Sequence, residues 1–188
     1  LQSLRGFSAS QSGLAQAPQA VGVFVVSNLV GKRAYQVVGP RRLMIGGTAV
    51  AAAVTCGFAL LTLETPLTLI AGMSFTRGLS MGLVFVSIQT AVYATTSLAD
   101  TGRATSLFGT QRQVSYAVGT AIGATVLTAS LGGLTESDPA IDRLPAHQYA
   151  FLAVGLIMIP GIFVAARIRD DDVAETRGLD PADVPAAR

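Results

Sequence analysis

The sequence contains almost none of the side chains that carry covalent catalysis or hold a metal ion. Cys56 is its only cysteine and His147 its only histidine. A single cysteine excludes a disulfide within the chain and a cluster of thiolate ligands. A hydrolase would need a nucleophile with its base, or a metal cluster, and no serine is placed to pair with His147, which we expect in an exposed loop. We therefore predict that the protein is not an enzyme and has no metal or cofactor.

Charged residues are also scarce, at 13% of the chain against about 25% in soluble proteins. Hydrophobic residues make up 51%, and the mean hydropathy is +0.54. The apolar residues fall in blocks, each long enough to cross roughly 30 Å of hydrocarbon as a helix. The basic residues are too scattered to form the patch that nucleic acid binding requires. The composition indicates an all-α polytopic bundle in a lipid bilayer, with no nucleic acid partner.

The apolar blocks predict five membrane spans within residues 1–168. Pro66 suits the first position of a helix, and Gly132 with Gly133 form a helix stop signal. Pro160 and Gly161 predict a kink or break in the last span. Residues 169–188 are charged and poor in large apolar side chains, which predicts a disordered tail. The predicted spans are residues 8–30, 43–63, 67–94, 105–131 and 149–168.

The basic residues predict the orientation of these spans, because lysine and arginine in short loops stay cytoplasmic. Seven of them fall on one side and two, Arg5 and Arg143, on the other. The C-terminus is therefore predicted to lie in the cytoplasm and the first residues outside, in the cell (inner) membrane. An odd number of spans with an external start suggests that preceding spans are missing. The seven are Lys32, Arg33, Arg41, Arg42, Arg103, Arg167 and Arg169.

Two pairs of glycines predict where helices pack closely. Gly78 and Gly82 lie in the third span, and Gly119 and Gly123 in the fourth. Each pair has the Gly-x-x-x-Gly spacing that lets two backbones approach in a membrane. The pattern is common in helical bundles, so it favours plain packing over a specific functional role.

Arg77 is the fixed charge buried deepest in the predicted spans. It lies about 16 Å along its helix, too deep to reach a headgroup easily. Burying it in lipid would cost at least about 2.5 to 3.5 kcal/mol, so we expect it to face a protein interior or a water-filled cavity and to have a partner. Ser74, Ser80 and Ser87 share its side of the helix and form one polar stripe.

Arg112 lies closer to its membrane surface, about 10 Å from the end of its predicted span. It shares a helix face with Tyr116 and is flanked by Gln111 and Gln113. It could reach the interface or bind carbonyls of a neighbouring helix, and it could equally face a transport cavity. We take these four residues, with Arg77 and Gln89, as candidates for a substrate cavity or gate.

No aspartate, glutamate or histidine lies inside any of the five spans. Proton coupling in transporters usually runs through such groups. These spans therefore cannot supply a proton-coupling site by themselves.

With spans and loops placed, the chain resembles the C-terminal part of the major facilitator superfamily, specifically the fourteen-span drug:proton antiporter type. The stretch "GKRAYQVVGPRRLM" is similar to the superfamily's basic cytoplasmic loop, although Tyr35 and Gln36 stand where that loop has charged residues upstream of Gly39. "RGLSMGL" and "SLFGTQRQVSYAVGTAIGATVL" are similar to two of the family's later spans. The first stretch, "LQSLRGFSASQSGLAQAPQA", is similar to its tenth span at Gly6, Phe7, Ser8, Ala9, Gly13, Leu14 and Pro18.

The resemblance implies the tenth to fourteenth spans of a secondary transporter that works by alternating access. It implies proton-coupled efflux of amphipathic small molecules or drugs, with an N-terminal half, protons and the substrate as partners. It also places Lys32, Arg33, Gly39, Arg41 and Arg42 in a cytoplasmic loop, where Arg41 and Arg42 would contact helix ends or anionic lipid. The alternative is a non-transporting membrane subunit or a truncated transporter remnant, because five spans cannot enclose such a pathway alone.

Overall fold

The computed structural model describes residues 7–94, 100–135 and 138–167. Every regular element in these residues is helical. The predicted tail, residues 169–188, lies outside them. The elements are α2 (Ala9–Val25), η1 (Val26–Val30), α3 (Gly31–Val38), α4 (Pro40–Gly57), η2 (Phe58–Leu60), α5 (Leu67–Ala94), α6 (Thr101–Leu131), α7 (Ala140–Ile157) and α8 (Ile159–Ala166).

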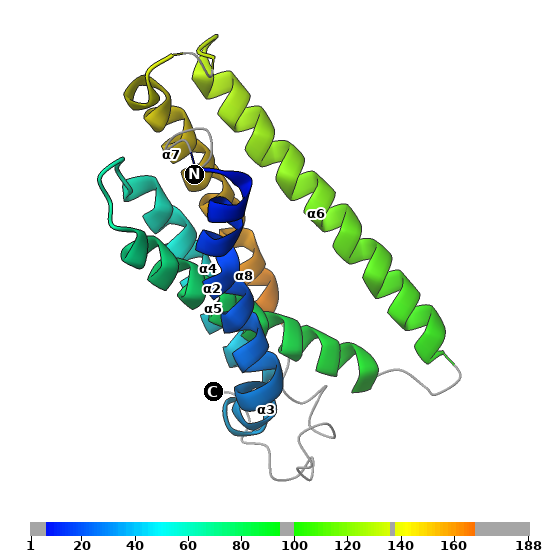
Figure 1. Cartoon of the computed structure of the whole chain (residues 1–188). Helices are drawn as coiled ribbons and strands as arrows, with labels where there is room; N and C mark the ends of the chain where they lie inside the picture. Colours follow the sequence, from blue (N-terminus) through cyan, green and yellow to red (C-terminus); the bar gives the residue numbers. More distant parts are fainter. Residues whose placement is uncertain (1–6, 95–99, 136–137, 168–188) are drawn as a thin grey trace.

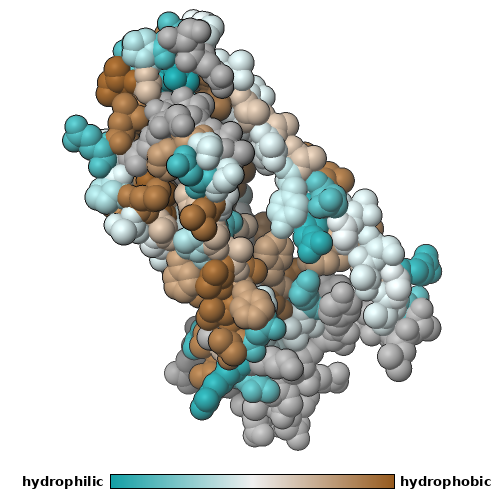
Figure 2. All heavy atoms as spheres, viewed as in Figure 1, coloured by the Kyte–Doolittle hydropathy of each residue, from teal (hydrophilic) through white to brown (hydrophobic). Residues whose placement is uncertain are grey.

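The structure consists of a packed helical bundle and one long helix, α6, that diverges from it (Figure 1). Helices α2, α4, α5 and α7–α8 gather into a bundle, while α6 meets α7 at one end and diverges from the bundle at the other. None of the described residues of α6 is buried. Figure 2 shows apolar side chains on the outside of several helices, as expected of a surface that faces lipid or another membrane segment.

Four helical segments are long and apolar enough to cross a membrane: Pro40–Leu60, Leu67–Thr90, Thr101–Leu131 and Ala140–Ala166. They correspond to the second to fifth predicted spans. The first predicted span differs, because α2 has 17 residues, fewer than the roughly 20 that a span needs, and its glutamines lower its hydropathy. It continues through the π-helical turn η1 into α3, so a fifth span in this region stays a prediction.

Small residues let α5 pack against two neighbours. A side chain at Gly78 would overlap the carbonyl of Gln19 on α2, and one at Gly82 would come within 2.9 Å of Val26 Cβ. On the other neighbour, a side chain at Gly47 of α4 would lie 2.9 Å from the carbonyl oxygen of Ser80. The backbones of α2, α4 and α5 are therefore closer than any side chain at these positions would allow.

The stretch predicted as a polar loop between the first two spans is instead helical except at Gly39. Tyr35 of α3 is buried, while Arg33 and Gln36 of the same helix are exposed. An amphipathic helix of this kind gains its stability by burying one face. Gly39 has φ 87°, which favours glycine, and Pro40 begins α4 directly after it.

The break predicted in the last span is confirmed at Met158, between α7 and α8. Pro160 lies in the first turn of α8, where its missing N–H leaves no helical bond unmade. Both helices run beside α4: a side chain at Gly155 would overlap the sulfur of Cys56. The stop predicted for α6 is also confirmed, with Gly132 in the left-handed conformation at φ 57°.

The prediction of a loop around His147 is wrong, because α7 begins at Ala140. Arg143 is buried, and its Nε donates to the carbonyl of Asp138 at 3.1 Å. His147 is half-buried, and its Nδ1 lies 3.0 Å from the carbonyl oxygen of Arg143. Hydrogen bonds from the N–H and hydroxyl of Thr135 hold the pKa of Asp138 below its usual value, with a smaller contribution from Arg143. This turn joins α6 to α7 at their contacting ends.

Candidate functional site

Arg77 of α5 contacts two other elements of the bundle, α2 and η2. Its Nη2 donates to Oε1 of Gln19 on α2 at 2.9 Å, and its Cζ lies 5.6 Å from the ring centroid of Phe58 in η2. Phe58 in turn stacks on Phe151 of α7, with centroids 5.4 Å apart. We call Gln19, Phe58, Arg77 and Phe151 the Arg77 cluster. The cluster thus links α2, α5, η2 and α7.

The partners of Arg77 within the described residues are neutral. A hydrogen bond to a charged group contributes roughly 1.5–3 kcal/mol, and a cation over an aromatic face about 0.5–2 kcal/mol. These contacts offset part of the cost of burial. Nε of Arg77 is nevertheless buried with no hydrogen-bond partner in the described part of the chain. The guanidinium therefore retains an unused donor and an uncompensated charge.

The serine stripe of α5 is buried within the bundle. Ser74, Ser80 and Ser87 are 6%, 4% and 0% exposed. The hydroxyl of Ser80 donates to the carbonyl of Thr76, and that of Ser87 to the carbonyl of Leu83. These bonds within the helix satisfy both hydroxyls without a ligand. The stripe marks the packed side of α5.

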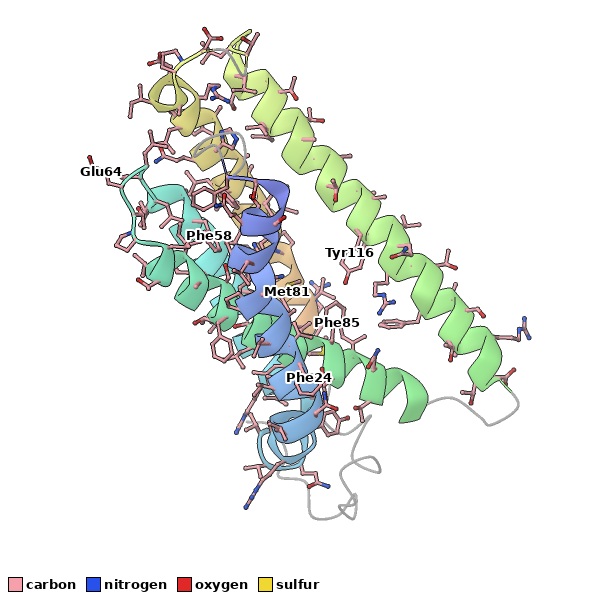
Figure 3. All side chains as sticks on the ribbon, viewed as in Figure 1. Phe24, Phe58, Glu64, Met81, Phe85 and Tyr116 are labelled. Atoms are coloured by element: carbon pink, nitrogen blue, oxygen red, sulfur yellow. The ribbon has the colours of Figure 1, made fainter. Side chains whose placement is uncertain are left out.

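Two polar residues of α6, Arg112 and Tyr116, lie on the face of this helix that is turned to the bundle. A side chain at Gly123 would lie 3.4 Å from Val154 of α7, so this face of α6 is turned to the bundle. Gly119 shares the face but has no neighbour within 4 Å, because the helices have already separated there. Tyr116 and Arg112 follow on the same face. Figure 3 shows Tyr116 projecting from α6 toward the other helices.

The remaining cavity or gate candidates are exposed. Tyr116 is 47% exposed, and Gln111, Arg112 and Gln113 are also exposed. Gln89 is exposed near the end of α5. The contacts of the described residues bring Arg77 and Gln19 together, but they do not bring Arg77 to the polar face of α6.

The predicted packing and loop residues also have distinct settings. Gly78 and Gly82 lie at the crossing with α2, Gly123 faces α7, and Gly119 faces open space. Arg33 and Arg42 are exposed and Arg41 is half-buried, at the end of the bundle where α3 meets α4. Lys32 lies in α3, one residue before Arg33. These placements leave the roles predicted for these residues untested.

Sequence reasoning missed Gln19 and Phe58 as partners of Arg77, and Phe151 as the ring that stacks on Phe58. Gln19 carries a usable signal, because it is a polar residue at the middle of the first predicted span, directly before its apolar half. Phe58 and Phe151 carry none, since a phenylalanine in an apolar block is usually a packing residue. Sequence reasoning also missed Gly22 as a packing residue. A side chain at Gly22 would overlap the backbone of α5 at Phe75.

A bundle of long apolar helices, with a deep arginine and a polar face on one diverging helix, defines a multi-pass α-helical membrane protein. The family model of the Major Facilitator Superfamily matches residues 1–187. The chain belongs to this superfamily.

Two curated proteins of Bacillus subtilis (strain 168) are similar to the chain. The uncharacterized MFS-type transporter YhcA is 33% identical over 128 residues, which are 68% of this chain and 24% of that relative. The multidrug transporter protein MdtP is 30% identical over 158 residues, 81% of this chain and 28% of that relative. The chain thus spans about a quarter of the length of the curated relatives it matches. No solved structure shows significant similarity to it.

Proposed function

We propose that the chain is the C-terminal part of a secondary transporter that exports amphipathic small molecules in exchange for protons. The similarity to a protein named as a multidrug transporter supports the substrate class. The coupling acids would lie in the preceding half, because no acid lies within the predicted spans. The end of the bundle that carries Arg41 and Arg42 would face the cytoplasm of the cell membrane.

The observation that carries this proposal is the polar face of α6. A helix of 31 residues is about 46 Å long, and Arg112 lies one turn, about 6 Å, from its midpoint at Tyr116. Contact with lipid at that depth would cost about 2.5–3.5 kcal/mol for an arginine. Because the part of this face from Arg112 to Gly119 is exposed in the described residues, we infer that it lines a wet pathway between two halves of the transporter.

A cysteine accessibility experiment tests whether the face is wet. In a Cys56→Ser background, we expect Tyr116→Cys to react with a membrane-impermeant methanethiosulfonate reagent at least about tenfold faster than Val114→Cys. The reason is that the reactive thiolate forms only where water is present. Val114 is the matched control because it is 51% exposed at a similar depth, on the opposite side of α6. Equal rates at the two positions would exclude a pathway along this face.

A further inference from the structure

Residues 31–42, which begin the consecutive helices α3 and α4, include four basic residues. Lys32 and Arg33 lie in the first turn of α3, and Arg41 and Arg42 in the first turn of α4. We call these four residues the basic cluster. Residues 31–42 contain no aspartate or glutamate. Within residues 7–94, 100–135 and 138–167, no side chain forms an ion pair with Arg33, Arg41 or Arg42.

The backbone adds to the positive field at this end. The N-cap of α4 is Gly39, which offers no side chain to accept a hydrogen bond from the first turn. The first N–H groups of a helix have no partner within it, and the helix dipole is positive at that end. Two arginines in the first turn strengthen this field, where an acidic side chain would offset it. The basic cluster therefore favours an anionic partner.

The end of α8 lies level with the first turn of α4, which carries Arg41 and Arg42. Helix α8 and the end of α7 run antiparallel to α4: a side chain at Gly155 would lie 3.3 Å from the carbonyl oxygen of Ala52, and one at Gly161 would lie 3.7 Å from Thr48. The same register places Arg167 level with the first turn of α4. Arg167 is also the last residue that the structure describes. The chain thus continues from a point next to Arg41 and Arg42.

The sequence that follows is strongly acidic. Residues 170–183 contain six acids and one arginine, a net charge of −5, against +4 for the basic cluster. The first acid, Asp170, is three residues beyond Arg167, within about 10 Å along an extended chain. We propose that residues 170–183 dock on the basic cluster through ion pairs. The contact would hold the C-terminal segment against the cytoplasmic end of α3 and α4, in the place that anionic lipid would otherwise occupy.

Paired cysteines test this contact in the whole protein, reconstituted in phosphatidylcholine nanodiscs. Val38, exposed between the two halves of the basic cluster, and Ala174 would be replaced by cysteine in a Cys56→Ser background. We expect a disulfide to form on oxidation, at a rate that falls several-fold as salt rises from about 0.1 M to about 1 M. Leu60, exposed at the opposite end of the α4–η2 segment, gives the control pair with Ala174 and should form no disulfide.

Charge reversal shows whether the ion pairs are the cause. Changing Asp170, Asp171 and Asp172 to lysine should slow disulfide formation about tenfold, because the encounter of the two segments is steered by charge. Adding Arg41→Glu and Arg42→Glu to that variant should restore the rate, which also shows that the variant is folded. A rate of disulfide formation that is the same in the charge variants and at both salt concentrations would overturn the proposal. So would loss of the disulfide in nanodiscs containing phosphatidylglycerol, because lipid would then be the occupant.

Discussion

Replacing Arg77 by methionine and Gln19 by leucine together is expected to leave the protein folded and to reduce drug efflux at least about tenfold. The double change leaves no polar group of this pair buried without a partner, so it should alter stability little. Arg77→Met alone leaves Oε1 of Gln19 without its donor and should destabilise the fold by about 1–3 kcal/mol. The efflux loss follows if the unused Nε–H and the positive charge of Arg77 act in transport.

The measurement is efflux of a fluorescent amphipathic dye from cells with matched membrane abundance, together with the melting temperature of the purified protein. Gln16→Leu is the control, because Gln16 is an exposed glutamine on the same helix. Unchanged efflux in the double variant would reduce the Arg77 cluster to a packing contact between α2, α5 and η2. Unchanged stability in Arg77→Met would show that the hydrogen bond between Arg77 and Gln19 does not stabilise the fold.

Gly78→Ala is expected to destabilise the fold by about 1–3 kcal/mol, although alanine is the better helix former. The added methyl group would overlap the carbonyl of Gln19, and a backbone atom within a helix cannot rotate away as a side chain can. Gly72→Ala on the same helix is the matched control. Gly72 has no neighbour within 4 Å, so the substitution should be neutral or stabilise by up to about 1 kcal/mol.

The melting temperatures of the two alanine variants in the same detergent compare these positions directly. We expect Gly78→Ala to melt below the parent and Gly72→Ala at or above it. Equal shifts for the two variants would show that α2 and α5 are further apart than the structure places them.

The sequence predicts helices well where hydrophobic pattern and end signals agree. Helix α5 has the bounds predicted from its apolar run, and α6 ends at the predicted glycine stop. The prediction of helices fails where a polar segment becomes helical because other segments bury one of its faces. The sequence of α3 is basic and predicts a loop, but the segment is a helix with Tyr35 buried. The polar start of α7 likewise predicts a loop, but it is helical with Arg143 buried.

One part of the candidate site could be predicted from the sequence and another part could not. The depth of Arg77 in an apolar run is visible in the sequence, and it predicts a partner by the cost of burial alone. The identity of that partner is not visible, because Gln19 is 58 residues away and reaches Arg77 only through the crossing of α2 and α5. The divergence of α6 from the bundle likewise leaves no mark in its hydrophobic pattern.

We propose that this chain belongs to a proton-driven exporter in which Arg77 acts. The most direct test of this proposal is transport by the whole protein in proteoliposomes with an imposed pH gradient. We predict that an amphipathic fluorescent cation moves against its concentration gradient only while the proton gradient lasts, and that the Arg77→Met and Gln19→Leu double variant loses this movement. Transport that continues at the same rate without a proton gradient, or that persists in the double variant, would exclude a proton-driven exporter in which Arg77 acts.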